Sequence, residues 1–165
     1  MGEVHVKVAD RNDVDGILRL QAANLHSAGG MLSAEFPRAW FERWLDVMPV
    51  LVARDGVSVV GYLISSTVAA NSDVGIVQAM LREVDLEEQH FIYGPICVDE
   101  YYRRKGIAAA LYNKLREILP GTTPITFIRR DNSKSLAAHL ALGMIEVATF
   151  THLGRAHAIL QASEA

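Results

Sequence analysis

The stretch over residues 91–119 constrains the fold most strongly, because a strand pattern leads there directly into a helix pattern. Residues 91–98 have the apolar composition of a strand, but Gly94-Pro95 interrupts them, and proline cannot donate a ladder hydrogen bond. We therefore expect a bulge or a splayed edge at this point. From Ile107 to Leu119 the apolar residues recur at helical spacing, and Pro120-Gly121 ends the helix. The segment therefore predicts a strand, a turn and a helix in this order.

The N-terminal part of the chain shows a second strand pattern followed by helix patterns. Val4, Val6 and Val8 alternate with polar residues, which predicts a half-buried strand. Apolar residues then recur at helical spacing over residues 14–25 and again over residues 33–47. Two helices are therefore predicted to follow the first strand.

Asp55-Gly56 is a strong hairpin signal, because it joins two runs rich in β-branched residues at 50–53 and 57–68. Residues 72–86 are predicted to hold a short helix within an inserted connection. The C-terminal part is predicted to add a strand, a helix ended by Gly143, and a closing pair of strands, at residues 123–128, 132–142, 145–152 and 156–160.

The composition narrows the class of protein. A length of 165 residues suits one domain over residues 1–165. A net charge of -3 and a pI of about 6.0 argue against a dedicated binder of nucleic acid or anionic membranes. The single cysteine, Cys97, has no partner for an internal disulfide. A single cysteine suits a reducing compartment, so we expect a cytoplasmic protein. The first residues lack a secretory pattern, and no stretch reaches the roughly 20 apolar residues of a membrane span.

Residues 98–108 have the composition of an anion-binding turn. Three basic residues, Arg103, Arg104 and Lys105, precede the predicted helix, and Gly106 and Ala108 keep the side chains at its start small. Backbone N–H groups at a helix N-terminus point toward an anion, and the helix dipole favours negative charge there. The pattern predicts a local phosphate site. The simpler alternative is a solvated basic turn that caps an ordinary helix.

This segment resembles the acetyl-CoA-binding signature of the GNAT superfamily of N-acetyltransferases, whose usual form is Val-Asp-Pro-x-Tyr-Arg-Gly-x-Gly-Ile-Gly. It departs from that form at Glu100, Arg104 and Ala108. The second family element, Asn-x-x-Ala/Ser-x-x-x-Tyr-x-x-x-Gly-Phe, is matched in spacing from Asn132 to Met144. Both elements occur in the family's order.

The resemblance implies an α/β fold of the GNAT type. Such a fold has a central, twisted, mixed and mostly antiparallel sheet of about seven strands with a splayed pair of parallel strands. About four or five helices flank the sheet. The element order predicted for residues 4–160 agrees with this arrangement.

The resemblance also implies a binding site for acetyl-CoA as cosubstrate. The backbone of Ile96, Cys97 and Val98 would pair with the pantetheine arm like an added strand. Asn132 would hydrogen-bond the pantetheine, and Ser135 would approach it from the same helix. Asn132 also fits the role of a helix N-cap, and the two roles are compatible. The pyrophosphate would be held by the turn made of Arg103, Arg104, Lys105, Gly106, Ile107 and Ala108.

Acetyl transfer needs a neutral amine to attack the thioester carbonyl, donors at the developing oxyanion, and an acid at the departing thiolate. A backbone N–H near Ile96 is the candidate oxyanion donor. His139 stands where the family usually has a tyrosine that protonates the CoA thiolate, so the resemblance implies His139 as the catalytic acid. The alternative is a packed histidine among Leu136 and Leu140.

No general base stands out in the sequence. Glu35, Glu88, His90 and Tyr93 are candidates, and each also fits a surface or packing role. Cys97 as an acyl-accepting nucleophile is disfavoured, because no Cys-His-Asn/Asp arrangement is recognisable and an isolated cysteine is usually a small buried residue.

Two further sets of residues have a structural and a functional interpretation. Phe36, Trp40 and Trp44 lie at helical spacing and either wall an acceptor pocket or pack in the core, and the core is favoured. His152 and His157 could face each other across the last hairpin as metal ligands, but no third ligand has matching spacing. A pair of strand histidines is the favoured interpretation, and we expect no metal.

We therefore expect an N-acetyltransferase that moves the acetyl group of acetyl-CoA directly onto a primary amine in a ternary complex. The acceptor is expected to be a small molecule rather than a protein, with no nucleic-acid or membrane partner, and the closing strands could pair in a homodimer. The alternative is a noncatalytic acyl-CoA-binding or regulatory module, which the tyrosine-to-histidine change at 139 keeps open. A generic nucleotide-binding domain is disfavoured because neither a Gly-x-x-x-x-Gly-Lys-Ser/Thr nor a Gly-x-Gly-x-x-Gly run occurs.

Overall fold

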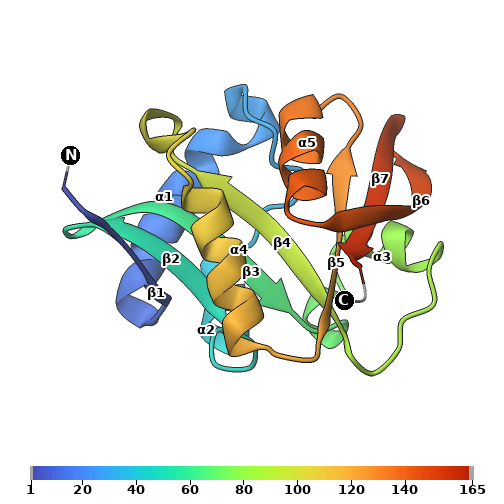
Figure 1. The fold of residues 1–165 in the computed structure, drawn as a ribbon, viewed down its shortest axis with the longest axis horizontal. Coiled ribbons are helices and arrows are strands. Elements are labelled where there is room, and N and C mark those ends of the chain that lie inside the picture. Colours follow the sequence, from blue (N-terminus) through green and yellow to red (C-terminus); the bar gives the residue numbers. More distant parts are fainter. Residues whose placement is uncertain (1, 164–165) are drawn as a thin grey trace. The chain divides into compact units, whose positions relative to one another are not determined.

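A computed structural model describes residues 2–163 of the chain (Figure 1). The chain divides into two compact units. The first unit consists of the residues up to Ser66 together with Gly94–Pro120. The second unit consists of Thr67–Tyr93 together with the residues from Gly121 onward. One domain over residues 1–165 stays a prediction.

The described residues form a mixed sheet and five α-helices, as the sequence predicts. The hydrogen-bonding order of the strands is β1-β2-β3-β4-β5-β7-β6. Only the β4–β5 ladder is parallel among those with an assigned register. The strands are β1 (Val4–Val8), β2 (Val50–Asp55), β3 (Ser58–Ser66), β4 (His90–Val98), β5 (Thr123–Arg129), β6 (Met144–His152) and β7 (Arg155–Ala162). The helices are α1 (Val14–Asn24), α2 (Arg38–Trp44), α3 (Gly75–Leu81), α4 (Ile107–Ile118) and α5 (Ser133–Ala141).

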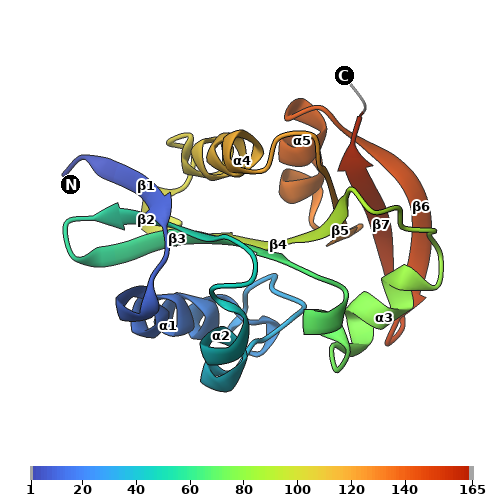
Figure 2. The same cartoon turned by 90° about the horizontal axis from the view of Figure 1, so that it is seen from below.

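In the first unit, α4 lies on one face of strands β1 to β3, and α1 and α2 lie on the other face (Figure 2). The register of β2 with β3 shifts between Ala53 and Arg54, which pair with Gly61 and Val59. This bulge changes the face to which successive β3 residues point. Val59 therefore packs on α1, where a Cβ at Gly16 would lie 2.6 Å from its Cγ2. Gly61 instead lies under α4.

The hairpin predicted at Asp55-Gly56 is present. Gly56 has a φ of +59°, a left-handed conformation that glycine adopts without steric cost. The turn brings Asp55 opposite Ser58 in the β2–β3 ladder. The two strands behind it are almost completely buried, so they form the centre of the first unit's core.

The second unit contains the beginning of β4, strand β5, the β6–β7 hairpin and helices α3 and α5. β4 pairs with β5 from His90–Thr123 to Ile92–Ile125. Both α3 and α5 pack against β6. The hairpin turns at Leu153 and Gly154, whose φ values of +49° and +76° match a two-residue turn that follows the twist of the strands. No helix among the described residues is long and apolar enough to cross a membrane.

The prediction of a helix over residues 33–47 is wrong at its beginning, because α2 starts only at Arg38. Proline disfavours helical geometry in the residue before it, so Pro37 excludes Phe36 from the helix. The side chain of Gln21 on α1 also holds Phe36 in an extended position. Its Nε2 donates to the Phe36 carbonyl and its Oε1 accepts from the Phe36 N–H, both at 2.9 Å.

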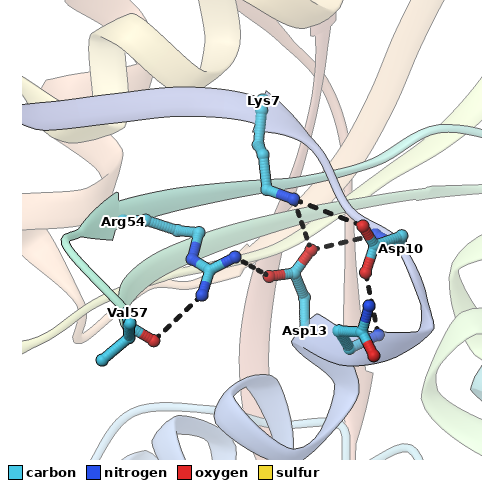
Figure 3. Close-up of polar contacts among 6 residues, drawn as sticks. Lys7, Asp10, Asp13, Arg54 and Val57 are labelled. Atoms are coloured by element: carbon cyan, nitrogen blue, oxygen red, sulfur yellow. Dashed lines mark hydrogen bonds and ion pairs between the residues drawn. The ribbon is translucent and has the colours of Figure 1, made fainter.

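A buried carboxylate fixes the beginning of α1 in the first unit (Figure 3). The Asp13 side chain has no exposed surface and lies 3.2 Å from Nη1 of Arg54 and 3.1 Å from Nζ of Lys7. It also accepts a hydrogen bond of 2.9 Å from the Asp10 N–H, while Asp10 accepts from the Asn12 N–H. These contacts form a reciprocal capping box on the 3-10 turn Arg11–Asp13, which runs directly into α1. Asp13 therefore ties the helix start to β1 and β2.

We expect Asp13→Ala to lower the free energy of unfolding by about 3 kcal/mol, because it leaves the Arg54 guanidinium without its buried partner and removes a cap. Urea denaturation followed by circular dichroism measures the change. Asp15→Ala is the matched control, because Asp15 pairs with Arg38 on the surface and should cost less than about 1 kcal/mol. Equal losses in the two variants would contradict a special role for the buried carboxylate.

Candidate active site

The turn between β4 and α4 lies in the first unit and has the geometry predicted for an anion site. A short 3-10 turn, Glu100–Tyr102, follows β4, and α4 begins directly after Gly106. Two residues of the turn have positive φ, Arg104 at +63° and Gly106 at +78°. Because the first N–H groups of a helix have no acceptor within that helix, α4 presents donors at this turn.

Contacts within the first unit hold the turn in place. The Asp99 N–H donates to the Val60 carbonyl at 2.9 Å, and Asp99 Oδ1 caps the 3-10 turn through the Tyr101 N–H at 2.9 Å. The Tyr102 hydroxyl donates to Asp55 Oδ2 at 2.7 Å. This hydrogen bond is the main reason that the pKa of Asp55 lies below its usual value and that of Tyr102 above.

The three basic side chains of the turn have different roles. Arg103 points back toward the protein, where its Nε donates to the Val98 carbonyl at 3.1 Å and its Nη2 donates to Asn24 Oδ1 at 2.8 Å. The Lys105 ammonium lies over the ring of Tyr102, 5.6 Å from its centroid. All three residues are exposed, but the guanidinium of Arg103 is engaged in these two hydrogen bonds. The positive charge available to an anion therefore comes mainly from Arg104 and Lys105, while Arg103 stabilises the turn.

The end of β4 carries the residues predicted to pair with pantetheine. Ile96 and Val98 are half-buried, and Cys97 is buried beside Tyr62. Burial raises the pKa of Cys97 to about 12, so its thiol stays protonated at neutral pH. The thiolate is the nucleophilic form of cysteine, so this environment disfavours an acyl-cysteine route.

The second unit brings His139 on α5 together with Tyr93 on β4. Nε2 of His139 lies 3.0 Å from the Tyr93 hydroxyl, and Nδ1 lies 2.7 Å from the carbonyl oxygen of Ser135. The Ser135 hydroxyl is 3.3 Å from the same Nδ1. Asn132 caps the helix, because its Oδ1 accepts from the Ser135 N–H at 3.3 Å. The N-cap interpretation of Asn132 is therefore confirmed.

The carbonyl of Ser135 decides the tautomer of His139. A carbonyl oxygen only accepts hydrogen bonds, so Nδ1 carries the proton and Nε2 accepts from the Tyr93 hydroxyl. Burial lowers the pKa of His139, and the bond to Ser135 opposes this shift only in part. The imidazole is therefore neutral at pH 7, with its basic nitrogen directed at Tyr93.

A sequence model of the acetyltransferase (GNAT) family matches residues 18–144. The chain belongs to the GNAT acetyltransferase family. No curated protein matches the chain.

Solved GNAT structures share the fold at low sequence identity. An N-acetyltransferase from Staphylococcus aureus Mu50 superposes with a TM-score of 0.73 at 20% identity, over 97% of this chain and 98% of that one. The protein YncA from Salmonella typhimurium, solved with its cofactor acetyl-CoA, superposes with a TM-score of 0.71 at 20% identity. The match covers 97% of this chain and 93% of that one. The ribosomal-protein-alanine N-acetyltransferase of Brucella melitensis has a TM-score of 0.70 at 20% identity, over 95% of this chain and 98% of that one.

Among the candidate bases of this GNAT protein, only Tyr93 contacts His139 in the described part of the chain. Glu35 and Glu88 are exposed. His90 accepts from the Glu87 N–H through Nδ1 at 2.9 Å and faces Gln161 Oε1 through Nε2 at 3.3 Å, so both its nitrogens have partners.

The aromatic residues of the region around α2 divide between core and surface. Phe36 is buried and packs against half-buried Trp40 with ring centroids 4.5 Å apart. Phe36 lies before α2 rather than on it, so the three aromatic residues do not form one helical stripe. Trp44 is half-buried under the guanidinium of Arg43, 4.9 Å from its ring centroid.

His152 and His157 are not cross-strand partners in the last hairpin. His157 lies opposite Phe150 and stacks on its ring at 4.8 Å, whereas His152 lies opposite Arg155. Residues 2–163 contain no group of three potential metal ligands. The sequence alone does not predict the hydrogen bonds Tyr102–Asp55 and Arg103–Asn24, because nothing in the linear pattern relates residues so far apart.

We expect the imidazole of His139 to titrate below pH 6.5 and to carry its proton on Nδ1. Because the unfolded state then binds more protons, His139 contributes stability above pH 6.5 that is lost as the pH falls through 6.5 toward the lowered pKa. Long-range ¹H–¹⁵N NMR correlation reports tautomer and pKa. His139→Gln should reduce the loss of stability between about pH 7 and 5. A proton on Nε2 would contradict the assignment.

Proposed function

We propose that the protein is an N-acetyltransferase that transfers the acetyl group of acetyl-CoA to a primary amine by direct attack in a ternary complex. The observation that carries this proposal is the turn from β4 into α4, with left-handed Arg104 and Gly106 at the start of a helix. Family membership supports acetyl transfer in general. The identity of the amine is an inference from chemistry.

The turn suits a pyrophosphate. Donors at the N-terminus of α4 and the dipole of this 12-residue helix favour an anion, and Arg104 and Lys105 add positive charge. Gly106 is exposed, and a Cβ built on it has no atom within 4 Å, so its backbone is open to close approach. We assign the pyrophosphate of acetyl-CoA to this turn, from Arg103 through Ile107 and Ala108.

The pantetheine arm is assigned to the backbone of Ile96, Cys97 and Val98. These residues follow Gly94, which has a φ of +97°, and lie beyond the three residue pairs that join β4 to β5. The structure of YncA from Salmonella typhimurium contains acetyl-CoA on a related fold, which supports a cofactor of this type here. Asn132 and Ser135 are the proposed polar contacts from α5.

The acceptor is proposed to be a small amine rather than a protein or a nucleic acid. A net charge of -3 gives no general attraction for polyanions, and the basic residues of the β4–α4 turn are assigned to the cosubstrate. Residues 1–165 act as one catalytic domain in this proposal, in the cytoplasm and without a metal. A homodimer through the closing strands is compatible with it.

A noncatalytic acyl-CoA-binding or regulatory module is the second candidate. The observation that favours it is the state of His139, whose side chain is buried and whose two ring nitrogens both have hydrogen-bond partners. A histidine in this state does not protonate a thiolate directly. The module would bind acetyl-CoA and release no thiol.

Acetyl-CoA turnover distinguishes the two candidates. Thiol release is measured with a panel of primary amines that includes polyamines, amino acids, aminoglycosides and peptides. Amine-dependent release, with acetylated product identified by mass spectrometry, supports the transferase. Binding of acetyl-CoA by calorimetry without release in the presence of any amine supports the module, and absence of binding overturns both.

We expect Gly106→Ala to weaken acetyl-CoA binding about tenfold, because a side chain at φ +78° costs roughly 1–2 kcal/mol and shifts the donors of the turn. Isothermal titration calorimetry measures the dissociation constant. Gly121→Ala is a closely matched control, since Gly121 has a φ of +74° and also has no atom within 4 Å of a built Cβ. Weaker binding in both variants would mean that general destabilisation is responsible.

A further inference from the structure

The hydrogen-bond chain Tyr93–His139–Ser135 has a fixed direction. The Ser135 carbonyl accepts from Nδ1 of His139, and Nε2 of His139 accepts from the Tyr93 hydroxyl. Both side chains are buried, with relative exposures of 2% for Tyr93 and 4% for His139. The rings meet edge to face with centroids 5.5 Å apart. In this geometry Nε2 accepts from the phenol, so the neutral imidazole has no proton on Nε2 to donate.

We propose that Tyr93 and His139 form a proton relay that takes the proton from the attacking amine, with Tyr93 as the catalytic group and His139 as the positioning residue and proton store. This inference rests on the proposed transferase function. It reverses the role that the sequence implies for His139, because a neutral imidazole with its proton on Nδ1 is a base toward Tyr93.

The proton transfers balance without a further reagent. As the amine nitrogen bonds to the thioester carbon, its proton passes to Oη of Tyr93 and the phenolic proton passes to Nε2 of His139. The resulting imidazolium keeps its Nδ1–H bond to the Ser135 carbonyl, which favours the charged form. When the C–S bond breaks, the electron pair leaves on sulfur. The relay then runs backward, so that Oη of Tyr93 gives a proton to the thiolate. The products are the amide and the free thiol.

Tyr93 stands at the right place in the chain for this role. It directly precedes Gly94-Pro95, the interruption of β4, and the residues assigned to pantetheine begin three positions after it, at Ile96. A tyrosine needed only for packing would not require a hydroxyl directed at a buried imidazole. Leaving such a group unpaired in the interior would cost roughly 1–3 kcal/mol, so the imidazole stabilises the Tyr93 hydroxyl at a defined position.

Few ionisable groups surround the imidazole within the second unit. The phenol of Tyr93 faces it from β4, and Ser135 faces it from its own helix. β6, which packs against α5, carries Glu146 and His152, and Glu146 is paired with Arg130. The protonation of His139 should therefore follow its own burial and its two hydrogen bonds.

The test compares Tyr93→Phe and His139→Gln with the wild type in amine acetylation. Phenylalanine keeps the ring and removes the hydroxyl, and glutamine keeps an acceptor for that hydroxyl but takes up no proton. We expect both variants to lower kcat by about 10²-fold or more, with the dissociation constant of acetyl-CoA changed less than about twofold. The double variant should be no slower than the slower single variant, because the residues act as one unit.

The pH profile provides the readout that a packing role would not change. The wild-type kcat should fall on the acid side as His139 becomes protonated, and this limb should be absent in His139→Gln. Tyr112→Phe is the control for loss of a hydroxyl from a buried tyrosine, because the Tyr112 residue on α4 is 5% exposed and has no part in the proposed relay. Circular dichroism verifies that each variant folds.

Three results would overturn the relay. An unchanged kcat in Tyr93→Phe would remove the tyrosine from the proton path. If His139→Gln retained the fall of kcat on the acid side, another group would be responsible for that fall. If the variant instead lost a fall of kcat only on the basic side, the histidine would act as an acid. Failure of the proposed function looks different, because the wild type would then release no thiol with any amine, and the relay would fall with it.

Discussion

The change of direction between β4 and α4 is the constraint on which the proposed site depends. Two residues with positive φ, Arg104 and Gly106, turn the chain from the strand into the helix within a few residues. The turn is then held by side chains far away in the sequence, since Tyr102 binds Asp55 and Arg103 binds Asn24. These contacts help to orient the donors at the start of α4.

Each unit contains a buried polar side chain that has lost its hydration, and the two units compensate this loss in different ways. In the first unit, the Asp13 carboxylate is compensated by Arg54, Lys7 and a backbone N–H. In the second unit, His139 is compensated without any charge, through a carbonyl and a phenol. The first arrangement can only stabilise, whereas the second keeps a titratable nitrogen in a defined tautomer. That difference makes the Tyr93–His139 pair the candidate for chemistry.

Most elements follow from local pattern, and the exceptions have identifiable causes. The alternation of Val4, Val6 and Val8 and the Asp55-Gly56 turn predict β1 and the hairpin correctly, because period and turn chemistry are local. The helix predicted over residues 33–47 loses its first turn to Pro37 and to the hydrogen bonds between Gln21 and Phe36. The pairing of Tyr93 with His139 joins residues 46 positions apart, and no sequence period connects them.

The sequence by itself determined the fold family, the strand–turn–helix segment and the identity of the basic and small residues in the turn. These are properties of local spacing, and the backbone preferences of glycine, proline and β-branched residues express them directly. Only the tertiary structure decided that Arg103 braces the turn and that Nε2 of His139 points at a phenol. Hydrogen-bond direction depends on which acceptor lies within about 3 Å, and that is fixed by packing between distant segments.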